Sequence, residues 1–300
     1  MPRHRTRRPA LSGLVTAAVL LLAGSAAGGA YLVARSPDDA HAAVTAVSSA
    51  SSPSATAGRS EEPEVDLDAE LAEAPSSADG ADVSVAVLDT ESGARAAYGD
   101  GAYDAASIVK VDILAALLLQ AQDEDRELNG AEQAYAEAMI RRSDNTSATE
   151  LLKVLGGEEA LDAANGRLGL TGTRAAHAWG LTQTTAADQV RLLEAVSGTD
   201  SELSAASRAY ITELMGQVEA DQRWGVSAAG TDAVLKNGWM PRTTTGLWDV
   251  NSIGRVTSGG HTLLVAVLSR GHATKEAGID LVESVARTAV GVAGAASGSG

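Results

Sequence analysis

A serine and a lysine spaced to form a nucleophile–base pair stand in residues 105–110, where Ser107 precedes Lys110 by three positions. Residues three apart lie on one face of a helix, one turn from each other. The run that follows, residues 111–121, is apolar almost all round, which is typical of a buried helix. Burial disfavours an ammonium and lowers its pKa, so Lys110 is predicted to accept the Ser107 proton near neutral pH. The first helical turn also leaves backbone N–H groups free to stabilise an oxyanion.

Two further short motifs supply side chains that could complete such a site. Ser143 and Asn145 flank an aspartate in Ser-Asp-Asn, between two predicted helices, and Lys236 begins Lys-Asn-Gly-Trp at the end of a predicted strand. Each motif also has a plain structural interpretation. Ser-x-x-Lys occurs by chance in many chains, Ser-Asp-Asn fits a helix-capping turn, and Lys-Asn-Gly fits a turn after a strand. Any one of them taken alone is weak evidence for catalysis.

Hydrophobic patterning predicts the elements that must position these motifs. Residues 83–88 alternate like a half-buried strand, and a turn at residues 89–93 leads into a second strand near residues 94–98. From there to residue 233 we expect helices only, and then three strands and a final helix. The helices are predicted at 111–121, 129–142, 185–196, 204–218 and 274–290, with two more ending at Gly156-Gly157 and Gly169, and the later strands at 233–236, 247–256 and 262–268.

This order predicts an α+β fold in which hairpins form a mostly antiparallel five-stranded sheet flanked by helices. The helical block is too large to be a loop, so a second, all-helical lobe is expected. Ser107 falls near the boundary of the two lobes, where clefts tend to form.

Taken together and in this order, the motifs at residues 107–110, 143–145 and 236–238 resemble those of class A β-lactamases and penicillin-binding proteins. The resemblance extends from the first hairpin to the last helix, residues 82–292. It implies the β-lactamase-like two-lobe fold and a serine that becomes acylated by its substrate. Three motifs in the expected order and contexts are far less probable by chance than any single one.

The resemblance assigns catalytic roles to four side chains. Ser107 would be the nucleophile and Lys110 the acceptor of its proton. Ser143 would relay a proton to the leaving nitrogen of the substrate. Lys236 would attract the substrate carboxylate, a role that an ammonium fills as a point charge.

The resemblance also implies a set of substrate contacts. Asn145 would hydrogen-bond a side-chain amide of the substrate, and the backbone N–H groups of Ser107 and Trp239 would hold the oxyanion. Asn237 and Gly238 would belong to the same binding strand. Asn237 is a departure, because the family usually has Thr or Ser there and its hydroxyl helps to hold the carboxylate. We therefore expect the substrate to bind more weakly or in a different orientation.

A second departure concerns deacylation. Class A enzymes carry a Glu on an omega-shaped loop before a Thr-Thr pair, which Thr184-Thr185 matches, but residues 168–183 contain no acidic residue. His177 is the one candidate base in that loop, although a lone histidine is more often structural. Without a base to activate water, hydrolysis of an acyl-enzyme would slow by ~10²- to 10⁴-fold.

Composition excludes several classes of function. The net charge is -16, and the chain has no cysteine and five scattered histidines. The acidic balance argues against nucleic-acid binding, and we expect neither a metal nor another cofactor.

The ends of the chain differ from its middle in composition. Residues 1–35 combine an arginine-rich start with an uncharged apolar stretch, which predicts a signal peptide or an N-terminal membrane anchor. Residues 36–81 are predicted to be a disordered linker rich in Ser, Ala, Pro and acidic residues, and residues 293–300 a disordered tail. The protein is expected to be exported, either secreted or held at the outer face of the cytoplasmic membrane through its N-terminal segment alone.

Three functions remain open at this point. The first is an exported class A-like β-lactamase. The second is a D-alanyl-D-alanine peptidase-like or other serine hydrolase that deacylates slowly, and the third is a non-catalytic module that binds peptidoglycan stems. In each case the expected ligand is a β-lactam or a small molecule resembling a peptidoglycan stem, and we expect a monomer.

Overall fold

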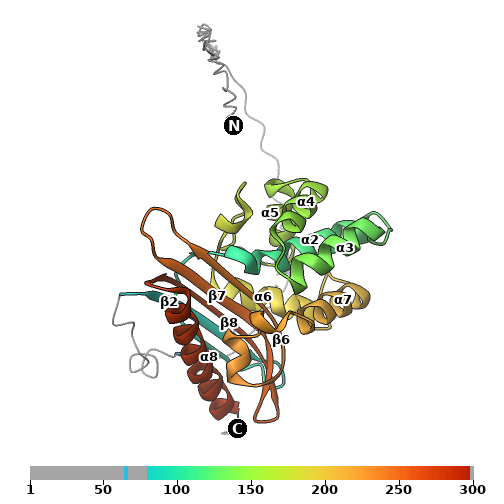
Figure 1. Ribbon diagram of the computed structural model, residues 1–300. Coiled ribbons are helices and arrows are strands. Elements are labelled where there is room, and N and C mark those ends of the chain that lie inside the picture. The colour runs from blue at the N-terminus through green and yellow to red at the C-terminus, as the bar shows by residue number, and fades with distance from the viewer. Residues whose placement is uncertain (1–63, 67–79, 298–300) are drawn as a thin grey trace, which may run out of the picture. The chain divides into compact units, whose positions relative to one another are not determined.

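The central sheet arises from strands whose alternate residues face opposite helical layers. The computed structural model describes residues 64–66 and 80–297 (Figure 1). Five strands are antiparallel neighbours in the order β3-β2-β8-β7-β6, which confirms the predicted five-stranded sheet. They are β2 (Asp82–Asp89), β3 (Arg95–Tyr98), β6 (Thr231–Pro241), β7 (Trp248–Ser258) and β8 (His261–His272). Strand β6 lies at one edge of the sheet.

Both faces of the sheet are covered, so strand β2 is not half-buried as predicted but buried on both sides. Val85 and Val87 pack in one apolar cluster with helix α8 (Lys275–Ser297). Ala86 and Leu88 belong to the other cluster, which includes the helical block. Figure 1 shows α8 lying along one face, and α6 (Ala186–Ser197) contacts β8, β2 and β7 on the other. A strand between two apolar layers needs no polar alternation.

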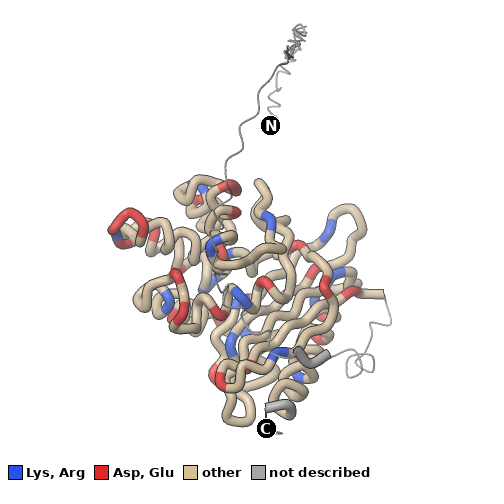
Figure 2. The backbone as a smooth tube through the Cα atoms, turned by 180° about the vertical axis from the view of Figure 1, so that it is seen from behind, with Lys and Arg blue, Asp and Glu red and all other residues tan. Residues whose placement is uncertain are grey.

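The helical block begins with the buried helix that the sequence predicted. Helix α2 (Val109–Asp123) is surrounded by α4, α5, α7 and α3. The other helices are α3 (Gly130–Arg141), α4 (Asn145–Leu155), α5 (Glu158–Arg167) and α7 (Ala205–Gly216). Acidic and basic residues are interspersed along these elements and the strands (Figure 2).

Helix ends follow the expected capping chemistry. The Asn129 side chain accepts from the backbone N–H groups of Ala131 and Glu132, and Glu132 accepts in return from the Asn129 N–H, which forms a capping box. Gly156 ends α4 with a φ of 109°, a left-handed conformation that glycine adopts without strain.

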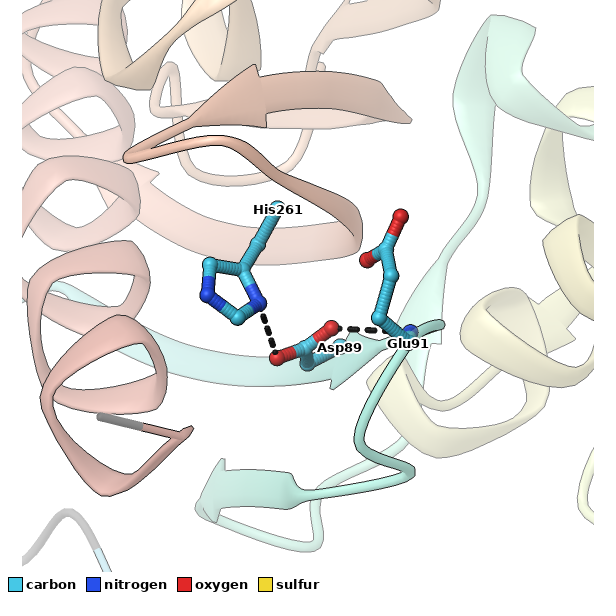
Figure 3. A group of neighbouring side chains, drawn as sticks. All are labelled: Asp89, Glu91 and His261. Atoms are coloured by element: carbon cyan, nitrogen blue, oxygen red, sulfur yellow. Dashed lines mark hydrogen bonds and ion pairs between the residues drawn. The ribbon is translucent and has the colours of Figure 1, made fainter. Parts of the chain in front are cut away.

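Two turns far apart in the sequence are joined by a carboxylate and an imidazole (Figure 3). His261, after the β7–β8 turn, lies with its Nδ1 2.9 Å from Oδ2 of the fully buried Asp89 at the end of β2. Asp89 also accepts from the backbone N–H of Glu91. Among the described residues these three form the one group whose carboxylate and imidazole atoms lie close enough to share a cation, within 4.8 Å of one another. The scattered histidines of the sequence did not suggest it.

The structure departs from the expected element list in three places. Tyr103–Asp104 (β4) and Gln183–Thr184 (β5) form a two-stranded pair inside the region expected to be helical. Glu64–Asp66 (β1), within the predicted linker, pairs in parallel with β3. Helix α8 continues to Ser297 through the predicted tail, because the alanines there favour helix and Ala293 is buried against the core.

The remaining predictions about the ends of the chain lie outside the described residues. These are the export segment at 1–35, most of the linker at 36–81, and residues 298–300. In the part of the chain that the structure describes, no helix is long and apolar enough to cross a membrane.

Asn129→Ala is expected to lower the free energy of unfolding by about 1 kcal/mol, because it leaves N–H groups at the start of α3 without their side-chain acceptor. Urea denaturation measures this loss. Glu127→Ala, an exposed neighbour, is the control and should leave the free energy of unfolding within about 0.5 kcal/mol. Equal stability of both variants would contradict the importance of the cap.

Candidate active site

The loop before Ser107 is held by side-chain hydrogen bonds from the sheet. Ser107 lies in the 3-10 helix η1 (Ala106–Ile108), directly before α2. The buried Asn251 side chain on β7 donates to the backbone carbonyls of Asp104 and Ala105, at 2.9 and 3.2 Å. Ala106 has a φ of 48°, a left-handed conformation that costs a non-glycine residue roughly 1–2 kcal/mol. The fold therefore holds Ser107 in a geometry that the chain would not adopt by itself.

Lys110 is the centre of the site. Its side chain is completely buried, and Nζ lies 3.0 Å from Ser107 Oγ, 3.0 Å from Ser143 Oγ, 2.6 Å from the Ser143 carbonyl and 2.8 Å from Asn145 Oδ1. Four oxygens exceed the three protons of an ammonium. A neutral amine also has three hydrogen-bonding directions, two N–H groups and a lone pair, so in either form two of the oxygens share one direction, and in the neutral form a hydroxyl can donate to the lone pair.

Electrostatics make the neutral amine accessible near pH 7. Burial lowers the pKa of Lys110 to about 7, and the charge of Asp144 opposes the shift only in part. Lys236 is also fully buried, and burial together with the charge of Lys110 holds the pKa of Lys236 well below its usual range. Lys110 is thus able to accept and return a proton near pH 7.

Ser143 and Asn145 reach the site because the loop between α3 and α4 is short and turns sharply at Ser143. Asp144 caps α4 by accepting from the Ser147 N–H at 2.7 Å, so the capping interpretation of Ser-Asp-Asn holds for its central residue. Ser143 itself has a φ of 57°, a second strained non-glycine residue in the site. This conformation turns both its carbonyl and its hydroxyl toward Lys110.

Strand β6 brings the third motif against η1. Lys236 Nζ lies 3.0 Å from Ser143 Oγ, so this hydroxyl stands between the two amines. A Cβ added at Gly238 would lie 2.7 Å from the backbone N of Ser107 and 2.8 Å from that of Ile108. Only glycine allows β6 to approach η1 this closely.

Asn237 points away from this cluster, because alternate residues of a strand face opposite sides. Its buried side-chain amide donates to the carbonyls of Gln222 and Trp224, at 2.8 and 3.0 Å. In this structure the Asn237 side chain therefore does not take the substrate-facing position that was predicted for it. The Trp239 side chain packs on Trp224, and Lys275 Nζ lies 3.9 Å from the Trp239 ring centroid.

His177 is not brought to the cluster either. Its imidazole is fully exposed and lies 3.4 Å from a carboxylate oxygen of Glu158, at the start of α5. A different residue of the same loop contacts the site. Trp179, in the 3-10 helix η2 (Trp179–Leu181), places its ring centroid 4.8 Å from Lys110 Nζ. Trp179 was not among the predicted site residues, although it is the large aromatic residue of a loop without acidic residues.

Sequence reasoning also missed the side chains that support the site. Asp104, three residues before Ser107, accepts from both Gln183 and Arg242. These contacts join β4, which lies just before η1, to β5 and to the segment after β6. Lone polar residues of this kind leave no pattern in a sequence.

Comparison with family models gives one match for this chain. A family model described as Beta-lactamase enzyme family matches residues 131–293, more than half of the 300-residue chain, although Ser107 and Lys110 precede the match. None of the curated proteins matches.

Solved structures show the same fold. A class A β-lactamase from Bacteroides cellulosilyticus is 17% identical with a TM-score of 0.63, over 76% of this chain and 96% of that one. PBP-A is 20% identical with a TM-score of 0.66, over 77% and 98%. An ancestral class A β-lactamase is 26% identical with a TM-score of 0.63, over 75% and 99%. A PBP-A variant, 22% identical with a TM-score of 0.65 over 77% and 98%, is an acyl-enzyme complex with penicillin G.

Gly238→Ala is expected to lower the free energy of unfolding by about 1–3 kcal/mol, because the new methyl group would collide with the backbone of η1. Chemical denaturation measures the change. Gly166→Ala is the matched control, since a Cβ there meets nothing within 4 Å and alanine favours the α5 helix. A Gly238→Ala variant as stable as Gly166→Ala would contradict the close approach of β6.

Proposed function

This chain belongs to the beta-lactamase enzyme family, and on that premise we propose that it is a serine hydrolase that forms an acyl-enzyme on Ser107 with β-lactams. One observation carries the proposal. The buried Lys110 amine contacts the Ser107 hydroxyl at 3.0 Å and has a pKa near 7, so a base and its nucleophile are in place before any ligand binds.

Acylation would proceed through three side chains. Lys110 Nζ takes the proton of Ser107 as Oγ attacks the carbonyl carbon of the lactam amide. The C–N bond then breaks, and Ser143 Oγ, 3.0 Å from each lysine amine, donates its proton to the leaving nitrogen and regains one from Lys110. The product is an ester on Ser107 with Lys110 again neutral.

Backbone groups and Lys236 would stabilise the developing charges. The N–H of Ser107 and that of Trp239 on the edge strand β6 are the proposed oxyanion donors. A substrate carboxylate arriving at Lys236 would favour the ammonium form of this lysine, so binding and proton uptake would be coupled.

Hydrolysis of the ester is proposed to be slow. In the described part of the chain, no carboxylate hydrogen-bonds to Ser107 or Lys110, and His177 faces Glu158 instead. Lys110 is then the one titratable group in contact with Ser107 that could activate water. Trapping by a β-lactam, as in a penicillin-binding protein or a D-alanyl-D-alanine peptidase, is therefore favoured over rapid turnover.

The first 35 residues are the basis for a proposed cellular location. Their arginine-rich start and apolar stretch support export, with the hydrolase domain outside the cytoplasmic membrane.

A fluorescent penicillin is expected to label the full chain covalently at Ser107, as read by in-gel fluorescence and peptide mass mapping. Ser107→Ala should abolish the label with circular dichroism unchanged, and Ser258→Ala, at the end of β7, should keep it. A chromogenic cephalosporin should turn over only slowly after the first equivalent. An unlabelled wild-type chain would favour the non-catalytic module, and labelled Ser107→Ala would contradict the nucleophile.

The acylation rate is expected to rise with pH and reach half of its plateau at about pH 7, because the neutral form of Lys110 accepts the proton and its pKa is about 7. Stopped-flow labelling between pH 5.5 and pH 9 would measure it. A rate that is flat over this range, or that falls as pH rises, would contradict Lys110 as the base.

A further inference from the structure

The Trp179 ring lies against the Lys110 amine, in addition to the oxygens that contact it. The ring centroid lies 4.8 Å from Nζ, within the range of a cation–π contact, while Ser107, Ser143 and Asn145 surround the amine with their oxygens. The result is a lysine with no solvent exposure at all.

The indole is held in this position from two directions. Its Nε1 donates to Thr149 Oγ1 at 3.2 Å, and that hydroxyl donates to the backbone carbonyl of Asn145 at 3.1 Å on α4. On the other side, the turn carrying Trp179 lies against the residue before the nucleophile, since a Cβ at Gly180 would be 4.0 Å from the Ala106 Cα. Trp179 is therefore hydrogen-bonded to α4, and the next residue of its turn packs beside η1, so the turn contacts both segments that deliver oxygens to Lys110.

This enclosure has a chemical consequence for an ester on Ser107. Hydrolysis needs a water within reach of the ester carbon and of a base that takes its proton, and the carbonyl–oxygen bond to Ser107 then breaks as Oγ is reprotonated. Lys110 is the base in contact with Ser107, and the apolar ring lies over its nitrogen on one side. A water cannot reach Nζ from that side while the ring is there.

We propose that Trp179 is a positioning residue that excludes water from Lys110 and so prolongs the life of the acyl-enzyme. The inference rests on the proposed acylation of Ser107. It attributes the slow hydrolysis of the ester to the Trp179 side chain. The absence of an acidic residue from residues 168–183 is the second cause. The inference also predicts that this protein holds its acyl group for as long as the ring stays in place.

The test compares acylation and deacylation by fluorescent penicillin in the full chain. Trp179→Ala is expected to release the label at least ~10-fold faster than the wild type, since water then reaches a base. The pH at which the acylation rate of this variant reaches half of its plateau should move above 7. Water stabilises the ammonium form of Lys110 more than one aromatic ring does, so the pKa of Lys110 rises when water replaces the ring. Trp179→Phe keeps a ring over the amine and should release the label at nearly the wild-type rate.

Leu181→Ala is the control, because Leu181 belongs to the same turn and is 41% exposed. It should leave both rates unchanged. If folded Trp179→Ala keeps its label as long as the wild type, or if its acylation rate reaches half of its plateau at the wild-type pH, the role of Trp179 is wrong while Ser107 acylation stands. If the wild-type chain is not labelled, the proposed function itself fails.

Discussion

The buried amine of Lys110 is the interaction on which the rest of the site depends. An ammonium without solvent would be strongly disfavoured, and the chain meets this constraint by surrounding the nitrogen with oxygens from η1 and from the α3–α4 loop. The same burial that makes the charge costly makes the amine a base near neutral pH. Burial of this one amine therefore accounts both for the oxygens packed around it and for its pKa of about 7.

Two strained residues and one glycine show how the fold enforces this arrangement. Ala106 and Ser143 both adopt left-handed conformations, and each lies next to or within the set of groups that contact Lys110. Gly238 lets β6 reach the backbone of Ser107. The stability of the two-sided core, with α8 on one face of the sheet and the helical block on the other, compensates for the strain.

In the proposed mechanism, the loop before α6 sets the balance between acylation and hydrolysis. In this chain the loop presents an indole to Lys110, whereas its one histidine points outward to Glu158. An aromatic face stabilises a cation and excludes water, but it cannot take a proton. The family fold is therefore compatible with a long-lived acyl-enzyme, and in the proposed mechanism the side chain at this loop position determines whether the ester persists or is hydrolysed.

The sequence by itself determined most of the elements and the three motifs, because hydrophobic period, capping residues such as Asn129 and the spacing of Ser107 from Lys110 are local properties. It also indicated the five-stranded antiparallel sheet through its hairpins. It did not indicate the short pair β4–β5, which depends on a contact between distant segments. Only the tertiary structure decided that Asn237 faces Gln222 and Trp224, and that Trp179 rather than His177 meets Lys110. Those outcomes depend on which side of a strand or turn packs against a distant segment, and that choice is made by the whole core.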